Sequence, residues 1–159
     1  MEGEKKKIFK NTYIATNVKT KEILSMMKVT DEYVHDSKAL PELVENIIKS
    51  NKIVGKIFAD RAYDNNDIFR HLGDNGILPC IKVRKNAMVE WKKGNILRNL
   101  SALSQRNDLQ KWKDNVSYGK RWIVETAVFS SIKRMFGEYV YSVRLKSDTG
   151  NDVKSILVQ

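Results

Sequence analysis

The chain has 159 residues, enough for one domain with a sizeable core, and 42% of them are hydrophobic. No apolar run approaches the roughly 20 residues needed to cross a bilayer, and the single cysteine, Cys80, excludes an intrachain disulfide or a cysteine-built zinc site. The formal net charge is +10, and the whole excess lies between Pro79 and Lys146. This concentration favours nucleic acid as a partner over a merely soluble basic surface, and a reducing cytoplasm, at the nucleoid, is the expected compartment.

The first part of the chain predicts a β-hairpin and a helix. Residues 8–18 and 23–30 are rich in β-branched and aromatic types and are separated by a polar turn, which is typical of two paired strands. Asp36 and Ser37 then stand where capping groups of a helix belong. Apolar residues recur after them at three- and four-residue spacing, which predicts one buried helix face made of Leu40, Leu43, Val44, Ile47 and Ile48.

Two more strands are predicted in the middle of the chain. Residues 53–59 are nearly all apolar, as expected of a strand that is covered on both faces. Residues 77–83 contain Pro79, which predicts a strand at the edge of the sheet. The short helix between these strands should begin after Asp64 or Asn65, and Gly73 or Gly76 should end it.

The basic segment and a last helix follow. Residues 84–117 are polar with weak periodicity, which predicts an insertion or long loop with some helix. A helix is predicted from about residue 119 to 136. Trp91, Trp112 and Trp122 lie among basic residues and could stack on bases, but packing in the core or between helices is favoured. The alternation of strands and helices predicts a single α/β domain over residues 1–159.

Two carboxylates stand at positions that suit a metal site. Asp60 follows an apolar strand directly, at the carboxyl end where open α/β sheets bind ligands. Glu125 shares one helix face with Phe129, Ile132 and Phe136, where a carboxylate is costly without a cation or donors. Oxygen ligands of this kind suit Mg²⁺ or Mn²⁺, which can act on phosphodiesters.

A plainer interpretation exists for each carboxylate. Glu125 can pair with Arg121, one turn earlier on the same helix, and such pairs are common. Asp60 can be a turn residue, because a short carboxylate readily accepts a hydrogen bond from the backbone nearby. Taken singly these interpretations are favoured, and only the occurrence of both carboxylates supports a metal site.

Several motifs, in this order, resemble the catalytic domain of insertion-sequence transposases of the DDE type. The resemblance covers residues 6–146, and its specificity comes from the order of the motifs, since each is weak alone. They are the hairpin segment 18–24, Val-His-Asp-Ser at 34–37, Ala-Asp-Arg-Ala-Tyr-Asp at 59–64, Gly-Ile-Leu-Pro at 76–79, Tyr-Gly-Lys-Arg-Trp-Ile-Val-Glu at 118–125 and Lys-Arg-Met-Phe-Gly-Glu at 133–138.

The resemblance implies a ribonuclease H-like mixed sheet flanked by helices, with an Asp-Asp-Glu triad that holds two Mg²⁺ or Mn²⁺ ions for DNA cleavage and strand transfer. Asp60 matches the second Asp of the family and Glu125 its Glu. Tyr118 and Arg121 match residues that contact DNA near the transposon end. Lys120 and Lys133 are added as DNA contacts, although the family's lysine falls at position 132, which is Ile here.

One departure concerns the first Asp of the triad, which the family carries on a central strand before the hairpin. Only seven residues precede Ile8, and none of them is Asp. We therefore expect a partial, N-terminally truncated domain that lacks this strand, with a gap of unpaired backbone groups between the hairpin and the 53–59 strand. Its expected partners are transposon-end DNA and, in a mixed oligomer, an upstream fragment or a full-length transposase.

Three functions remain open at this point. The first is a transposase catalytic fragment that is inactive alone. The second is a non-catalytic DNA-binding remnant that modulates a full-length transposase. The third, a basic RNA-associated protein, is allowed by the charge but is not favoured by the order of the motifs.

Overall fold

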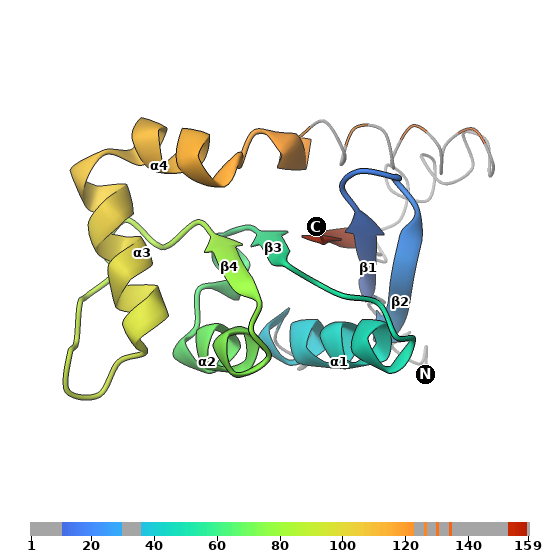
Figure 1. Ribbon diagram of the computed structural model, residues 1–159, viewed down its shortest axis with the longest axis horizontal. Helices are drawn as coiled ribbons and strands as arrows, with labels where there is room; N and C mark the ends of the chain where they lie inside the picture. Colours follow the sequence, from blue (N-terminus) through green and yellow to red (C-terminus); the bar gives the residue numbers. More distant parts are fainter. Residues whose placement is uncertain are drawn as a thin grey trace, which may run out of the picture.

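The computed structural model describes residues 11–29, 36–122, 126, 130, 134 and 153–158. Five strands form one sheet in the order β2-β1-β5-β3-β4, with helices on both sides of it (Figure 1). The elements, in chain order, are β1 (Asn11–Asn17), β2 (Ile23–Val29), α1 (Asp36–Lys49), β3 (Lys56–Ala59), a 3-10 turn (Arg61–Tyr63), α2 (Asn66–Asp74), β4 (Leu78–Ile81), α3 (Ile96–Asn107), α4 (Leu109–Val116) and β5 (Val153–Val158). The α/β class is as predicted.

The hairpin and the edge strand confirm the sequence patterns. β1 and β2 pair antiparallel, with a register shift between Ala15 and Thr16. β3 and β4 pair parallel, and β4 lies at the edge of the sheet, where the missing N–H of Pro79 can be tolerated. Gly76 has a φ of +68°, which lets the chain turn sharply between α2 and β4.

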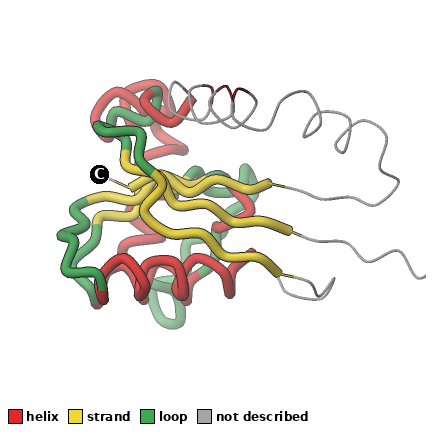
Figure 2. The backbone as a smooth tube through the Cα atoms, turned by 90° about the vertical axis from the view of Figure 1, so that its right-hand side faces the viewer, coloured by secondary structure: helices red, strands yellow, loops and turns green. Residues whose placement is uncertain are grey.

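The centre of the sheet differs from the prediction. A gap was expected between the hairpin and β3, but β5 lies there. It pairs parallel with β1 along its whole length, and antiparallel with β3 at Ile57 and Phe58 only. β5 is therefore paired extensively with the hairpin and only briefly with β3. Figure 2 shows the strands side by side between the helical layers.

The core has two parts because successive residues of a strand face opposite sides of the sheet. On one side α1 and α2 pack against Ile57 and Ala59, and on the other α4 packs over Phe58 (Figures 1 and 2). All three of these β3 residues are fully buried, which confirms that the strand is covered on both faces. The strand begins at Lys56 and not at residue 53 as predicted, and Ile53 is 99% exposed. On α1 the predicted apolar face is buried except at Ile48.

Residues 84–117 are more ordered than the predicted long loop. They contain α3 and α4, and Asp108 joins the two helices by capping α4 through a hydrogen bond from the Lys111 amide to its Oδ1. The weak periodicity has a physical reason, because α3 buries polar Asn99 and Gln105 on its inner face. In the described part of the chain no helix is long and apolar enough to cross a membrane.

Candidate active site at the end of β3

Asp60 is the first residue after β3, at the point where the chain leaves the sheet. Its Oδ1 accepts a hydrogen bond of 2.8 Å from the Ala62 amide and so caps the 3-10 turn. Asp60 therefore does act as a turn residue, which was the plainer interpretation of this carboxylate in the sequence. The side chain is still 49% exposed, so the carboxylate remains accessible to solvent and to a ligand.

Tyr118 connects the motif at 118–125 to this strand end. Ser117 adopts a left-handed conformation after α4, and the chain turns there toward the sheet. The Tyr118 ring then packs against Trp112, with 5.2 Å between the ring centroids, and its hydroxyl donates a 3.0 Å hydrogen bond to the Ala59 carbonyl. The residue is buried, so the structure gives it a clear role in fixing the end of β3.

Arg121 completes the link between the motif at 118–125 and the motif at 59–64. Its Nη1 donates to the Tyr118 hydroxyl at 3.1 Å, and its Nη2 lies 3.8 Å from Asp60 Oδ2. Because Asp60 is half exposed, this ion pair is screened and orients the two side chains more than it stabilises the fold. The structure therefore brings Tyr118 and Arg121 to the Asp60 strand end, and the predicted convergence of Asp60 with Glu125 stays a prediction. Glu125, the alternative partner of Arg121, lies outside the described residues.

The other predicted DNA contacts are less defined. Lys120 is exposed at the start of the helical residues 120–122, after the turn that follows α4, and Lys133 lies outside the described residues. Among the tryptophans, Trp112 is buried as expected. The packing role predicted for Trp91 and Trp122 is wrong, because they are 59% and 72% exposed.

Positive charge gathers beside Asp60. Burial, followed by the charges of Arg61, Lys113, Arg121 and Lys85, lowers the pKa of Lys82. Burial is the larger cause, and the four neighbouring cations lower the pKa further because they disfavour the charged form of Lys82. Several cationic side chains therefore lie close together beside Asp60, in agreement with the charge distribution in the sequence.

Asp64 belongs to the same motif as Asp60, at 59–64, but its environment is different and was not predicted from the sequence. Its side chain is fully buried and pairs with Arg98 of α3 at 2.7 Å, while the Arg84 amide donates to its Oδ2 at 2.9 Å. Of the two predicted caps of α2, Asn65 has this role, and it accepts a hydrogen bond from the Asp67 amide. Asp64 thus fastens the β4–α3 segment to the site.

A family model described as the transposase DDE domain matches residues 1–154. The chain belongs to the family of DDE-domain transposases. Neither a curated protein nor a solved structure matches it. The family relates the chain to DNA transposition, and the α/β sheet with its helical layers is compatible with the ribonuclease H-like fold.

DDE-domain transposases generally use divalent metal ions, so the fit of such an ion matters. Among residues 11–29, 36–122 and the other described positions, no three His, Cys, Asp or Glu side chains form a metal-binding group. Asp60 does fit as one ligand, since Oδ2 is a hard oxygen at an exposed strand end. Mg²⁺ is commonly held by one or two protein carboxylates, with water and substrate phosphates completing its shell.

Proposed function

We propose that this chain supplies part of a metal-dependent site for DNA strand cleavage and strand transfer at transposon ends. Asp60 and Glu125 would provide the protein carboxylates for Mg²⁺ or Mn²⁺, and such ions, when bound, stabilise the negative charge that develops on a phosphodiester. The proposal is carried by one observation: Tyr118 and Arg121, from the motif at 118–125, meet the Asp60 strand end within hydrogen-bonding or ion-pair distance.

Each side chain of the site has a separate task in this proposal. Asp60 keeps Oδ1 in the turn and would offer Oδ2 to the metal, while Arg121 restrains the carboxylate through its ion pair with the same Oδ2. Tyr118 holds the Ala59 carbonyl and thereby the position of Asp60. Arg121, Lys120 and Lys133 would contact the DNA backbone, with Tyr118 at the edge of that surface.

We also propose that the chain alone cleaves DNA weakly or not at all. Its sequence has no match to the family's first Asp, and two carboxylates hold a pair of ions poorly. An upstream fragment or a full-length transposase would then be its partner at the nucleoid. The third carboxylate would come from that partner.

The metal role of Asp60 can be tested without catalytic activity. Fe²⁺ with ascorbate and peroxide cuts a protein backbone close to the bound ion, and Mg²⁺ competes for the same oxygens. We expect cuts near residues 60 and 125 that excess Mg²⁺ suppresses. Asp60→Asn should abolish them while keeping the fold, because Asn also accepts the hydrogen bond from the Ala62 amide.

Asp74→Asn is the matched control, since Asp74 is an exposed carboxylate at the end of α2. It should leave the cuts unchanged. Cuts that persist in Asp60→Asn, or that fall far from both positions, would remove Asp60 from the site. A second arm adds a segment that carries the missing Asp and measures Mg²⁺-dependent nicking. If the chain with the added segment binds DNA but does not nick it, the proposed roles of Asp60 and Glu125 are wrong.

A second candidate is a non-catalytic DNA-binding remnant that modulates a full-length transposase. It is favoured by the cationic surroundings of Lys82 beside an incomplete triad. Under this candidate Asp60→Asn binds DNA as well as the parent chain does, and no Fe²⁺ cuts occur near residue 60. Binding that does not weaken as salt rises would exclude it, because phosphate contacts release counterions.

A further inference from the structure

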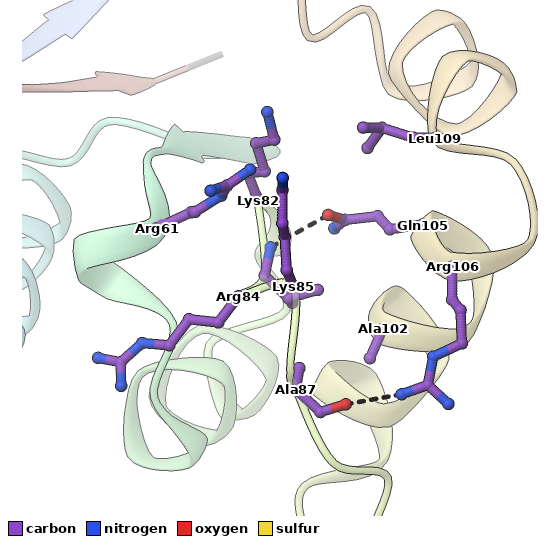
Figure 3. A pocket seen from close by; sticks show the side chains of 10 residues that line it. Arg61, Lys82, Arg84, Lys85, Ala87, Ala102, Gln105, Arg106 and Leu109 are labelled. Carbon is purple, nitrogen blue, oxygen red and sulfur yellow. Dashed lines mark hydrogen bonds between the residues drawn. The ribbon is translucent and has the colours of Figure 1, made fainter.

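A cavity of about 180 Å³ lies between the β4–α3 segment and α3, next to the Asp60 strand end. Arg61 lines it and directly follows Asp60, and Lys82 lines it from a position where its amide donates to the Ala59 carbonyl at 3.4 Å. Figure 3 shows the side chains of Arg61, Lys82 and Lys85 directed toward the same side of this space. The cavity is thus contiguous with the proposed active site but uses other residues.

The wall of the cavity is held by buried side-chain hydrogen bonds. Gln105 of α3 accepts from the Val83 amide at 3.1 Å and donates to the Ile81 carbonyl at 2.9 Å. Its neighbour Arg106 donates to the Ala87 carbonyl at 2.8 Å (Figure 3). These bonds hold the backbone on both sides of Lys82 and Lys85, so the two lysine side chains extend from a fixed backbone. Gln105 is a positioning residue in this arrangement.

The charge of the cavity is not balanced by the described residues that line it. Its lining contains five cationic side chains and no carboxylate, and the cations are Arg61, Lys82, Arg84, Lys85 and Arg106. In the part of the chain that the structure describes, Arg61, Lys82 and Lys85 form no ion pair with an acidic residue. Like charges held together without a counter-charge destabilise a protein, unless an anion occupies the site.

We propose that this cavity is a phosphate subsite that holds one backbone phosphodiester of the DNA strand running past Asp60, with Arg61, Lys82 and Lys85 as its ligands. The inference rests on the proposed function and adds to it a fixed point for the strand outside the metal site. A guanidinium and two ammonium groups offer donors around a phosphate, and each contact releases counterions from the DNA. Because Arg61 directly follows Asp60, the held phosphate lies close to the one that reacts.

The test combines salt-dependent binding with lysine footprinting on the full chain. The probe is a labelled duplex that contains the DNA flanking the gene, and its affinity is measured between 50 and 200 mM salt. Lys82→Gln should weaken binding about 5- to 10-fold at 0.1 M salt and reduce the slope of log K against log salt by about 0.9. Lys49→Gln on α1, an equal change of charge across the sheet, should alter neither.

Footprinting distinguishes the source of the phosphate. The duplex should protect Lys82 and Lys85 from an amine-reactive reagent and leave Lys49 reactive. Inorganic phosphate at the same phosphate concentration should protect them much less, since it lacks the rest of the strand. Protection by inorganic phosphate alone, or unchanged labelling of Lys82 in bound duplex, would overturn the subsite. The Fe²⁺ cuts at residue 60 do not depend on Lys82, so that failure would leave the proposed function standing.

Discussion

Asp60 and Asp64 are four residues apart in one motif, and they are treated in opposite ways by the fold. Asp64 is fully buried and receives hydrogen bonds from Arg98 and from the Arg84 amide. Asp60 is half exposed, receives one amide hydrogen bond and has a guanidinium 3.8 Å away. Both oxygens of Asp64 accept hydrogen bonds from the protein, whereas the Asp60 carboxylate remains partly available to a ligand. Within one motif, therefore, Asp64 maintains the structure and Asp60 remains able to bind a ligand.

The largest expected effect comes from Asp64→Ala. Removing this carboxylate leaves the mostly buried Arg98 charge and the Arg84 amide without their partner. Breaking a buried ion pair in this way costs about 3–5 kcal/mol of the free energy of unfolding. Urea denaturation followed by circular dichroism measures it, and Asp60→Asn should change the same quantity by less than about 0.5 kcal/mol.

Asp67→Ala provides the control, because the Asp67–Arg70 pair lies on the surface, with side chains 81% and 55% exposed. Its loss should cost less than about 1 kcal/mol. Asp64→Leu combined with Arg98→Met should recover much of the stability, since both buried charges are then gone. If Asp64→Ala and Asp67→Ala lose equal stability, the contrast between the two carboxylates of the motif is wrong.

A smaller effect is expected for Tyr118→Phe, which removes the hydroxyl that holds the Ala59 carbonyl. The Lys82 amide remains as a weaker donor to that carbonyl, so the loss of stability should be about 1 kcal/mol. The Fe²⁺ cuts near residue 60 should also diminish, because Asp60 loses its restraint. Ser50→Ala, which removes a hydroxyl bond to the Ile47 carbonyl at the end of α1, should leave these cuts unchanged.

An effect confined to high pH concerns Cys80, which is buried under Trp112 and Tyr118 on the α4 side of the sheet. Burial raises the pKa of its thiol from 9.0 to about 11. In the unfolded chain the thiol ionises first, so the free energy of unfolding should decrease between pH 9 and about pH 11. Cys80→Ala should remove this part of the slope. Iodoacetamide at pH 8 should alkylate Cys80 faster in the Tyr118→Phe variant than in the parent chain. The rate of alkylation in the Asp67→Ala variant should equal that of the parent chain.

Local patterns were sufficient for most of the fold. The hairpin, α1, the two-sided burial of β3 and the edge position of β4 follow from alternation, three- and four-residue spacing, apolar runs and Pro79. β5 was not predicted, and strand character in residues 153–158 would not by itself specify a partner in the sheet. The helical content of residues 84–117 was underestimated, since buried Asn99 and Gln105 interrupt the apolar spacing on α3.

The site was predictable to a similar degree. Asp60, Tyr118 and Arg121 were identified from their motifs, and the structure brings them together. The Asp64–Arg98 pair was missed because its members are 34 positions apart and neither stands in a pattern that predicts the other. The frame made by Gln105 was missed for the same reason. Glu125 and Lys133 lie outside the described residues, so their roles stay predictions.

The position of β5 also affects how the chain can reach its folded state during synthesis. β1 pairs with a segment from the opposite end of the sequence, and the same segment bridges to β3. Until residues 153–158 leave the ribosome, β1 and β3 each offer an open row of backbone donors and acceptors to other nascent chains. A sheet that closes this late should fold slowly and depend on chaperones that shield exposed edges.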